Sequence, residues 1–275
     1  MITPGKREVV ITGDDLGLRP DWDHAIFEAF DFGSVTSTSV ATNGATYVAA
    51  ASTLVNRGLD CGVHLNLLHG RPLSPPSEVR SLVDADGSFP GSVARVLLAY
   101  ACRRLRLEEI AREWSRQVER AVSDGLRPTH LNGHFHLHLL PRLFPIARDL
   151  ARRFDIPWIR LPDEAPADAA GLTATARGIA LSRLCRRARA RQAMHEPALI
   201  SCRGVGFSGG LDDDAWERIL QRLPTGATPV EVMCHPGQTP RESAALRSPA
   251  LLHKLRSQCH LRSFGELPLP DGTCR

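Results

Sequence analysis

Short apolar runs alternate with longer amphipathic stretches through the first third of the chain. Residues 9–12 form a β-branched run that ends at Gly13, which is the pattern of a buried strand. The stretch that follows places Ala25, Ile26 and Ala29 on one face, as an amphipathic helix requires. The pattern predicts strands at residues 9–12, 35–41 and 61–67 and helices at residues 21–32 and 47–57. This β-α-β-α-β order is typical of a parallel sheet with helical crossovers.

The alternation continues along the chain, with two interruptions. It predicts further strands at residues 129–132, 158–161, 229–233 and 261–264 and helices at residues 93–123, 143–154, 212–223 and 251–257. The interruptions are a Pro- and Gly-rich loop at residues 70–90 and an Ala- and Arg-rich helical excursion at residues 165–198. About seven strands, with no Gly-rich dinucleotide motif after the first, favour an α/β fold of the distorted or incomplete TIM-like (β/α) barrel type. We expect residues 1–275 to form a single domain.

Composition limits the classes of protein to consider. The 275 residues carry a net charge of only +4, and no basic segment is interleaved with aromatic residues, so nucleic acid is not expected as a partner. No apolar run reaches the roughly 18 residues of a membrane span, and the polar start at residues 1–7 does not resemble a signal peptide. The seven cysteines are odd in number and lack CxxC spacing. We therefore expect reduced thiols and a cytoplasmic location.

Acids and imidazoles fall where the predicted strands end. Asp14 and Asp15 follow the first strand, and His64 lies near the end of the third. Three histidines, His134, His136 and His138, follow the strand at 129–132, and His235 follows the strand at 229–233. The carboxyl ends of parallel strands meet on one face of a barrel, where active sites are built. We therefore expect these side chains to share one site.

Two adjacent carboxylates are suited to different tasks. One can bind a metal ion while the other takes a proton from a water that the metal has acidified. Successive side chains of an extended strand point to opposite sides, so Asp14 and Asp15 must lie in a turn, which Gly13 and Gly17 are placed to supply. The alternative interpretation of the pair is a helix N-cap with surface charge.

The histidines have structural alternatives too. His64 is compatible with a hydrogen-bonded core residue, and His235, before Pro236 and Gly237, with a turn residue. The run from His134 to His138 places three imidazoles on one side if it stays extended, and three such groups need polar partners or a metal. Asp15, His64 and one histidine of the run would leave coordination positions open, as catalytic sites require. His69 opens the long loop and is a further candidate.

Five motifs, in order along residues 8–240, resemble the YdjC-like carbohydrate deacetylases, which include chitooligosaccharide deacetylases and hopanoid-biosynthesis-associated members. They are Thr12-Gly13-Asp14-Asp15-Leu16-Gly17, Val35-Thr36-Ser37-Thr38, Gly62-Val63-His64-Leu65, the segment from Thr129 to His138, and Glu231-Val232-Met233-Cys234-His235-Pro236-Gly237. The sequence departs from the usual pattern at Gly13 and Leu16. It also has Asn132-Gly133 where members commonly have Asp-Ser.

The resemblance implies a metal-dependent hydrolase that removes an N-acetyl group from an amino sugar or glycoconjugate. By position, Asp15, His64 and His134 would be metal ligands, Asp14 the catalytic base, and His235 the acid or a substrate contact. The cofactor would be one divalent ion, Zn²⁺ or Mg²⁺ first, with Co²⁺ or Mn²⁺ as alternatives. A homodimer is a possible assembly.

Two other classes of function stay open at this point. A different barrel metallohydrolase, such as a phosphoesterase or a cyclic amidase, would need a second metal and more carboxylates at the strand ends. A non-catalytic sugar-binding relative is the second alternative.

Overall fold

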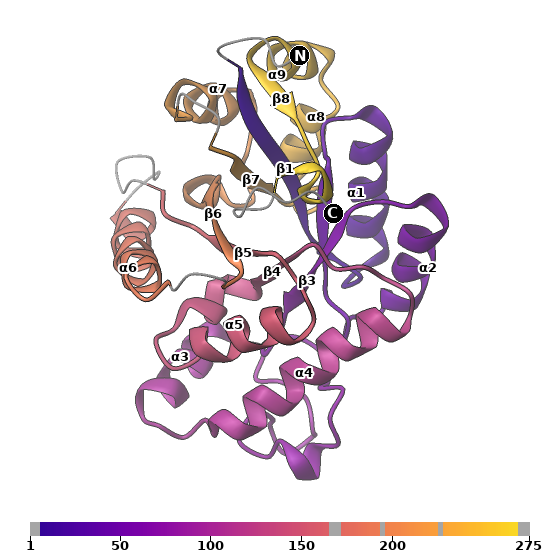
Figure 1. The fold of residues 1–275 in the computed structure, drawn as a ribbon. Helices are drawn as coiled ribbons and strands as arrows, with labels where there is room; N and C mark the ends of the chain where they lie inside the picture. Colours follow the sequence, from indigo (N-terminus) through magenta and orange to yellow (C-terminus); the bar gives the residue numbers. More distant parts are fainter. Residues whose placement is uncertain (1–5, 165–171, 193–195, 225–227, 269–275) are drawn as a thin grey trace.

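The computed structural model describes residues 6–164, 172–192, 196–224 and 228–268. Its strands are β1 (Arg7–Leu16), β2 (Ser37–Val40), β3 (Cys61–Leu65), β4 (His130–Gly133), β5 (Trp158–Leu161), β6 (Ala198–Arg203), β7 (Val230–Cys234) and β8 (Cys259–Leu261). All pairings are parallel, in the order β2-β3-β4-β5-β6-β7-β1-β8, and a further pairing of β2 with β1 closes seven strands into a barrel. The predicted TIM-like (β/α) barrel is confirmed, and Figure 1 shows helices around it.

Helices connect the strands and cover the outside of the barrel (Figure 1). They are α1 (Pro20–Phe32), α2 (Tyr47–Arg57), α3 (Val93–Ala101), α4 (Leu107–Ser123), α5 (Phe144–Arg153), α6 (Leu172–Arg189), α7 (Asp213–Arg222), α8 (Pro240–Leu246) and α9 (Pro249–Gln258). The 3-10 segment η2 (His134–Leu139) follows β4 directly. Glycines in the left-handed region, Gly33 and Gly58, end α1 and α2.

The barrel is distorted at β1, because the two halves of this strand pair with different neighbours. The amino-terminal half of β1 pairs with β8, from Arg7 opposite Cys259 to Val9 opposite Leu261. The carboxyl-terminal half pairs with β2 instead, beginning at Thr12 opposite Ser37. β8 therefore lies outside the closed ring of seven strands.

Side chains inside the barrel change from apolar to polar along the strands. At the amino-terminal end, Val10 packs with an apolar cluster that fills the bottom of the barrel: Trp158, Ala198, Ile200, Phe264 and Leu267. Two residues further along these strands, Thr12 and Arg160 are fully buried, and Asp14 follows. The alternate residues, such as Val9 and Ile11, face outward and pack under the helices. The apolar layer stabilises the barrel, and the polar layer above it forms the floor of a site.

Several predicted boundaries were wrong. The sequence pattern missed β6 and α8, and it placed the last strand at 261–264, where the structure has β8 at Cys259–Leu261. The single helix predicted at 93–123 is two helices, because Arg103 takes a left-handed conformation with φ of 56°. Of the excursion predicted at 165–198, residues 172–189 form α6, Ala198 begins β6, and residues 165–171 and 193–195 lie outside the described part of the chain.

Candidate metal centre

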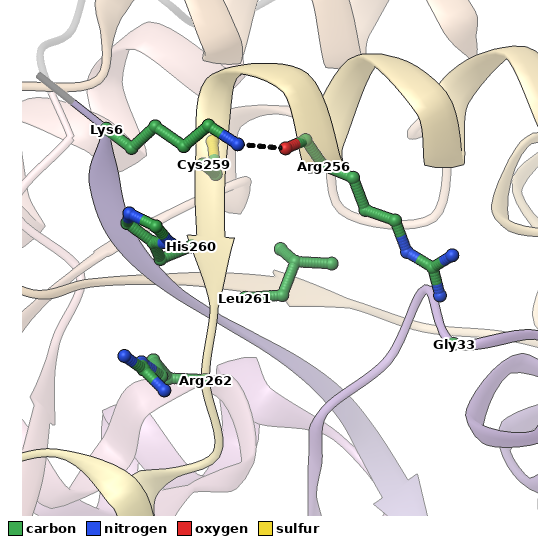
Figure 2. Close-up of a pocket in the computed structure, with 7 residues that line it drawn as sticks. All are labelled: Lys6, Gly33, Arg256, Cys259, His260, Leu261 and Arg262. Carbon is green, nitrogen blue, oxygen red and sulfur yellow. Dashed lines mark hydrogen bonds between the residues drawn. The ribbon is translucent and has the colours of Figure 1, made fainter. Parts of the chain in front are cut away.

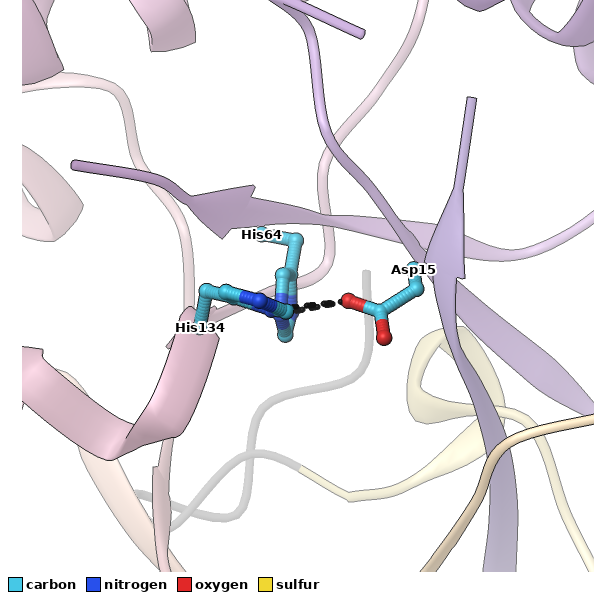
Figure 3. A group of neighbouring side chains, drawn as sticks. All are labelled: Asp15, His64 and His134. Atoms are coloured by element: carbon cyan, nitrogen blue, oxygen red, sulfur yellow. Dashed lines mark hydrogen bonds and ion pairs between the residues drawn. The ribbon is translucent and has the colours of Figure 1, made fainter. Parts of the chain in front are cut away.

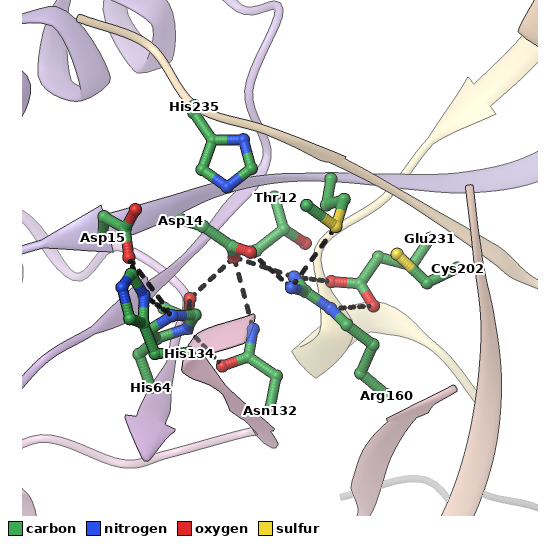
Figure 4. Close-up of polar contacts among 12 residues, drawn as sticks. Thr12, Asp14, Asp15, His64, Asn132, His134, Arg160, Cys202, Glu231 and His235 are labelled. Atoms are coloured by element: carbon green, nitrogen blue, oxygen red, sulfur yellow. Dashed lines mark hydrogen bonds and ion pairs between the residues drawn. The ribbon is translucent and has the colours of Figure 1, made fainter. Parts of the chain in front are cut away.

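Four strands deliver acids and imidazoles to one end of the barrel. Asp14 and Asp15 lie on β1, His64 on β3, His134 directly after β4, and His235 directly after β7. Figure 4 shows all five side chains around one space, with His235 pointing toward the two aspartates. Each is less than 10 % exposed. The sequence-predicted candidates are therefore neighbours in the fold.

Asp15, His64 and His134 form the tightest group of this site (Figure 3). Oδ1 of Asp15 lies 3.2 Å from Nε2 of His64 and 2.9 Å from Nδ1 of His134, and the two nitrogens are 3.1 Å apart. Bonds of about 2.0–2.2 Å to one tetrahedral ion place ligand atoms roughly 3.4 Å apart. The three atoms therefore face one another at nearly the spacing that a shared cation imposes, and these residues fit a divalent metal.

The aspartate pair converges through a β-bulge and not through the glycine turn predicted from the sequence. Asp14 and Asp15 both lie within β1, whose pairing with β2 shifts register between Gly13 and Leu16. Asp15 itself takes the left-handed region, with φ of 70°, and Gly17 follows with φ of 90°. A bulge adds a residue to one strand and redirects its side chain, so two successive carboxylates reach the same side.

Hydrogen bonds behind His64 fix which of its nitrogens faces the group. Nδ1 of His64 lies 2.7 Å from Oδ1 of Asn132 and 2.9 Å from Oγ of Ser39. The Ser39 hydroxyl donates to Oδ1 of Asp14 at 2.7 Å, so Nδ1 of His64 must be the donor toward Asn132. Nε2 of His64 then presents a lone pair toward Asp15, as a metal-binding imidazole does. Asn132 supplies this acceptor where the family commonly has Asp.

Arg160 was not among the residues singled out from the sequence, although it determines the state of Asp14. Its guanidinium is fully buried and forms a two-bond ion pair with Asp14, through Nη1 to Oδ2 and through Nη2 to Oδ1, the latter at 2.8 Å. Nε of Arg160 also donates to Oε2 of Glu231 at 2.9 Å (Figure 4). The sequence did contain a signal for this contact: Arg160 and Glu231 are each the single charge inside an apolar strand pattern. A buried charge needs a partner, so two such charges of opposite sign are candidates for an ion pair.

These neighbours hold both aspartates in the charged form. Burial raises the pKa of Asp14, but the charge of Arg160 and the hydrogen bonds from its guanidinium outweigh burial and hold this pKa well below its usual range. Burial also raises the pKa of Asp15, and His134 and His64 in their protonated forms, through their charge and their hydrogen bonds to the carboxylate, lower it well below the ordinary value. Both carboxylates are therefore ionised at neutral pH, as a metal ligand and a proton acceptor must be.

The histidine run does not stay extended, so its three imidazoles do not share one side. Phe135 and His136 both take left-handed conformations inside η2, with φ of 51° and 57°. His134 alone of the run joins the metal-binding group. His138 points away from it, and its Nε2 donates to the carbonyl of Arg160 at 3.0 Å. Gly133 permits this fold, because a Cβ there would lie 3.0 Å from Nδ1 of His138.

The segment after β7 adds two contacts to the site. Nε2 of Gln238 donates to Oδ2 of Asp15 at 2.8 Å and so orients the carboxylate from the side away from the imidazoles. Nδ1 of His235 lies 3.4 Å from Oγ of Ser208. The backbone N–H of His235 donates to Oε1 of Glu242 at 2.5 Å, which anchors the turn. Gln238 was not identified from the sequence.

The long loop that follows β3 is held in place by buried polar residues of α4. The Glu113 carboxylate accepts hydrogen bonds from the backbone N–H groups of Leu73 and Ser74, at 3.0 and 2.8 Å. His69, at the start of the loop, is exposed, and its ring centroid lies 5.0 Å from that of His134. The loop therefore brings His69 to the rim of the site, as its position in the sequence suggested.

A surface pocket lies far from this site, where β1 and β8 begin (Figure 2). Two of its cations have local roles: Lys6 donates to the carbonyl of Arg256 at 2.7 Å, and Arg262 pairs with Glu8 at 3.0 Å. The length of β1, at about 3.3 Å per residue, places Lys6 roughly 30 Å from Asp15. This pocket is not part of the candidate metal centre.

The chain is similar in sequence to proteins named as deacetylases. Two relatives cover most of it: a chitooligosaccharide deacetylase of Yersinia enterocolitica, 31% identical over 83% of this chain and 81% of its own, and a carbohydrate deacetylase of Geobacillus stearothermophilus, 32% identical over 84% and 79%.

A solved structure from Enterococcus faecalis, named as a candidate cellobiose-phosphate cleavage protein, shares the fold. Its TM-score is 0.72, at 23% identity over 94% of this chain and 98% of that one. The family model of the YdjC-like proteins matches residues 8–257. The chain therefore belongs to the YdjC-like protein family.

Proposed function

We propose that this protein is a metal-dependent carbohydrate N-deacetylase, which hydrolyses the acetamide of an amino sugar or glycoconjugate to acetate and an amine. The observation that carries the proposal is the group formed by Asp15, His64 and His134, with the ionised Asp14 directly before Asp15 in the same strand. The relatives named as deacetylases support the reaction type.

Asp15, His64 and His134 would hold the metal, which when bound polarises the amide carbonyl and acidifies water. One carboxylate and two imidazoles suit Zn²⁺, and open positions filled by water would also permit Mg²⁺, Co²⁺ or Mn²⁺. Among the residues that the structure describes, this is the one group of three or more ligating side chains. A two-metal phosphoesterase would need a second such group, which weighs against that alternative.

Asp14 is the proton acceptor in this proposal. Its Oδ1 accepts hydrogen bonds from Ser39 and Asn132 as well as Arg160, whereas within the described part of the chain Oδ2 accepts from Arg160 alone. A carboxylate oxygen has two lone pairs, so Oδ2 keeps one free for the proton of the attacking water. Arg160 makes Asp14 a weaker base but keeps it ionised and fixes its orientation.

His235 is the proton donor for the departing amine. It directly follows β7, the strand beside β1, and its ring points toward the aspartate pair (Figure 4). The reaction then balances: water adds its oxygen to the acetyl carbon, Asp14 takes a proton, and the C–N bond breaks as His235 protonates nitrogen. The products are acetate and a free amino sugar.

Paired variants test the division of roles. Asp14→Asn should bind one metal ion per chain, as we expect for the wild type, and lose at least about 100-fold in kcat. His64→Ala and Asp15→Ala should lose both metal and acetate release. Metal content and acetate release are measured on the same samples. Full turnover by Asp14→Asn would exclude Asp14 as the base, and full metal content in His64→Ala would exclude the ligand set.

A further inference from the structure

The backbone directly after His134 is strained. Phe135 (φ 51°, ψ 23°) and His136 (φ 57°, ψ 26°) are consecutive left-handed residues. This conformation favours Asn-Gly, and it crowds the Cβ atom of any larger residue. An aromatic residue followed by histidine is therefore an unfavourable choice for this turn. Such strain persists where the surrounding structure enforces it, and it gathers at functional sites.

The strained turn sends neighbouring side chains in different directions. His134 points inward to Asp15, and Leu137 and His138 are buried in the fold. Phe135 lies between them in sequence, yet 51% of its surface is exposed. A side chain that leaves so much apolar surface in water gains little from folding, so folding stability does not account for a phenylalanine here.

The exposed ring lies at the rim of the metal centre. The Phe135 and His134 rings are perpendicular, at 90°, with centroids 4.9 Å apart. His69 meets His134 from the loop after β3, with centroids 5.0 Å apart. The Phe135 ring thus contacts His134 on one side, and its exposed half leaves a flat apolar surface open beside the ligand. Among the exposed large apolar side chains of the described residues, it is the aromatic one.

We propose that Phe135 is a substrate-positioning residue on which a sugar ring of the substrate stacks. A pyranose ring presents C–H groups on one face and hydroxyl groups at its edge, so an open aromatic face beside the reacting centre matches it in shape and polarity. The inference rests on the proposed deacetylase function and names the part of the site that holds the saccharide. The strained backbone keeps this ring next to His134 while His134 itself stays directed at Asp15.

Kinetics on the metal-loaded enzyme, with N,N′-diacetylchitobiose as the probe, test whether the Phe135 ring is a stacking platform for the sugar. Phe135→Ala and Phe135→Leu should raise KM about tenfold, the weight of one stacking contact, and leave kcat within about twofold. Phe135→Trp should keep the wild-type KM, because it restores a flat ring. Metal content and melting temperature should not change in any of them. Val122→Ala, at a residue 44% exposed near the end of α4, is the matched control and should change nothing.

A binding measurement separates this inference from the proposed function. Calorimetry of N,N′-diacetylchitobiose binding to Asp14→Asn, with and without Phe135→Ala, measures the contribution of the Phe135 ring to binding without turnover. A tenfold loss of affinity supports it. The stacking proposal is overturned if Asp14→Asn has the same affinity with and without Phe135→Ala, or if no saccharide binds at all. It is also overturned if Phe135→Leu and the wild type have the same KM. If saccharide binds but the wild type releases no acetate, the deacetylase proposal fails and the platform stands. Phe135→Asn, whose side chain suits the left-handed backbone, replaces Phe135→Ala if that variant does not fold.

Discussion

Nδ1 of His64 donates a hydrogen bond to Oδ1 of Asn132 at 2.7 Å, and this contact turns Nε2 of His64 toward Asp15. Mutation of the residue that hydrogen-bonds the other nitrogen of a metal-binding imidazole typically lowers metal affinity by about 10–100-fold. Asn132→Ala should therefore weaken metal binding by about that factor, measured by competition with a chelator. Asn132→Asp keeps the acceptor oxygen and should stay within a few-fold of the wild type. Unchanged affinity in Asn132→Ala would mean that this hydrogen bond does not orient His64.

Arg160 should set the acid limb of the activity profile. In the wild type, the charge of this residue outweighs burial and holds the pKa of Asp14 well below its usual range. In Arg160→Met, burial remains and the attraction is lost, so the pKa of Asp14 rises. Because the base must be deprotonated, the fall of kcat/KM at low pH should move upward by at least about one pH unit. Arg160→Lys, which keeps a charge, should shift it less.

The same pair contributes to stability with a defined pH dependence. A carboxylate whose pKa is lower in the folded chain than in the unfolded one stabilises the fold above its ordinary pKa of 3.8, and the contribution is lost as pH falls below that value. At neutral pH, Arg160→Met leaves Asp14 and Glu231 buried without their shared cation, which should cost about 3–5 kcal/mol in the free energy of unfolding. Urea unfolding at pH 7 measures the loss. A loss below about 1 kcal/mol would contradict the buried ion pair.

His138 should make the fold less stable in mild acid. Burial is the main cause that lowers its pKa from 6.5 to about 4. Between these values the unfolded chain binds a proton that the folded chain does not, so the free energy of unfolding decreases as pH falls from about 6.5 toward 4. His138→Gln keeps a donor for the Arg160 carbonyl and does not titrate. Its stability should depend on pH less steeply, by up to about 1.4 kcal/mol per pH unit, in urea unfolding at pH 7, 6 and 5. Parallel curves for variant and wild type would show that His138 already titrates normally in the fold.

Gly62 should tolerate no side chain. A Cβ at this position would lie 2.3 Å from the carbonyl oxygen of His130 and 2.5 Å from its ring. The neighbouring backbone of β4 would have to move, and overpacking of this kind costs about 1–3 kcal/mol or more. Gly62→Ala should lower the free energy of unfolding by at least about 2 kcal/mol, whereas Gly58→Ala lacks such a clash and should cost less. Equal losses in the two variants would contradict the close contact of β3 with His130.

The sequence was sufficient for the barrel because its strands are short apolar runs with helices between them. The sequence was not sufficient for elements whose conformation is decided by tertiary contacts and not by the local residue pattern. The break between α3 and α4 falls at Arg103, with no Gly or Pro to mark it. β6 begins at Ala198 with few β-branched residues, and its pairing with β5 and β7 decides its conformation.

The candidate site, like the fold, could be predicted from the sequence only in part. Counting acids and imidazoles at strand ends was enough to select Asp14, Asp15 and His64. The role of each depended on contacts between residues far apart in sequence, such as Arg160 on Asp14 and Gln238 on Asp15. The choice of His134 within its run came from family resemblance, and the structure adds a physical reason. The left-handed turn at Phe135 separates it from His136 and His138.

The most direct test of the metal-dependent deacetylase is a metal titration. The chain is stripped of metal with a chelator, and Zn²⁺ or Mg²⁺ is added back while acetate release is followed across a panel of N-acetylated amino sugars and glycoconjugates. The account predicts no activity without metal and a linear rise that saturates at one ion per chain. Acetate release that survives metal removal, saturation at two ions, or no acetate from any substrate at saturating metal would contradict it.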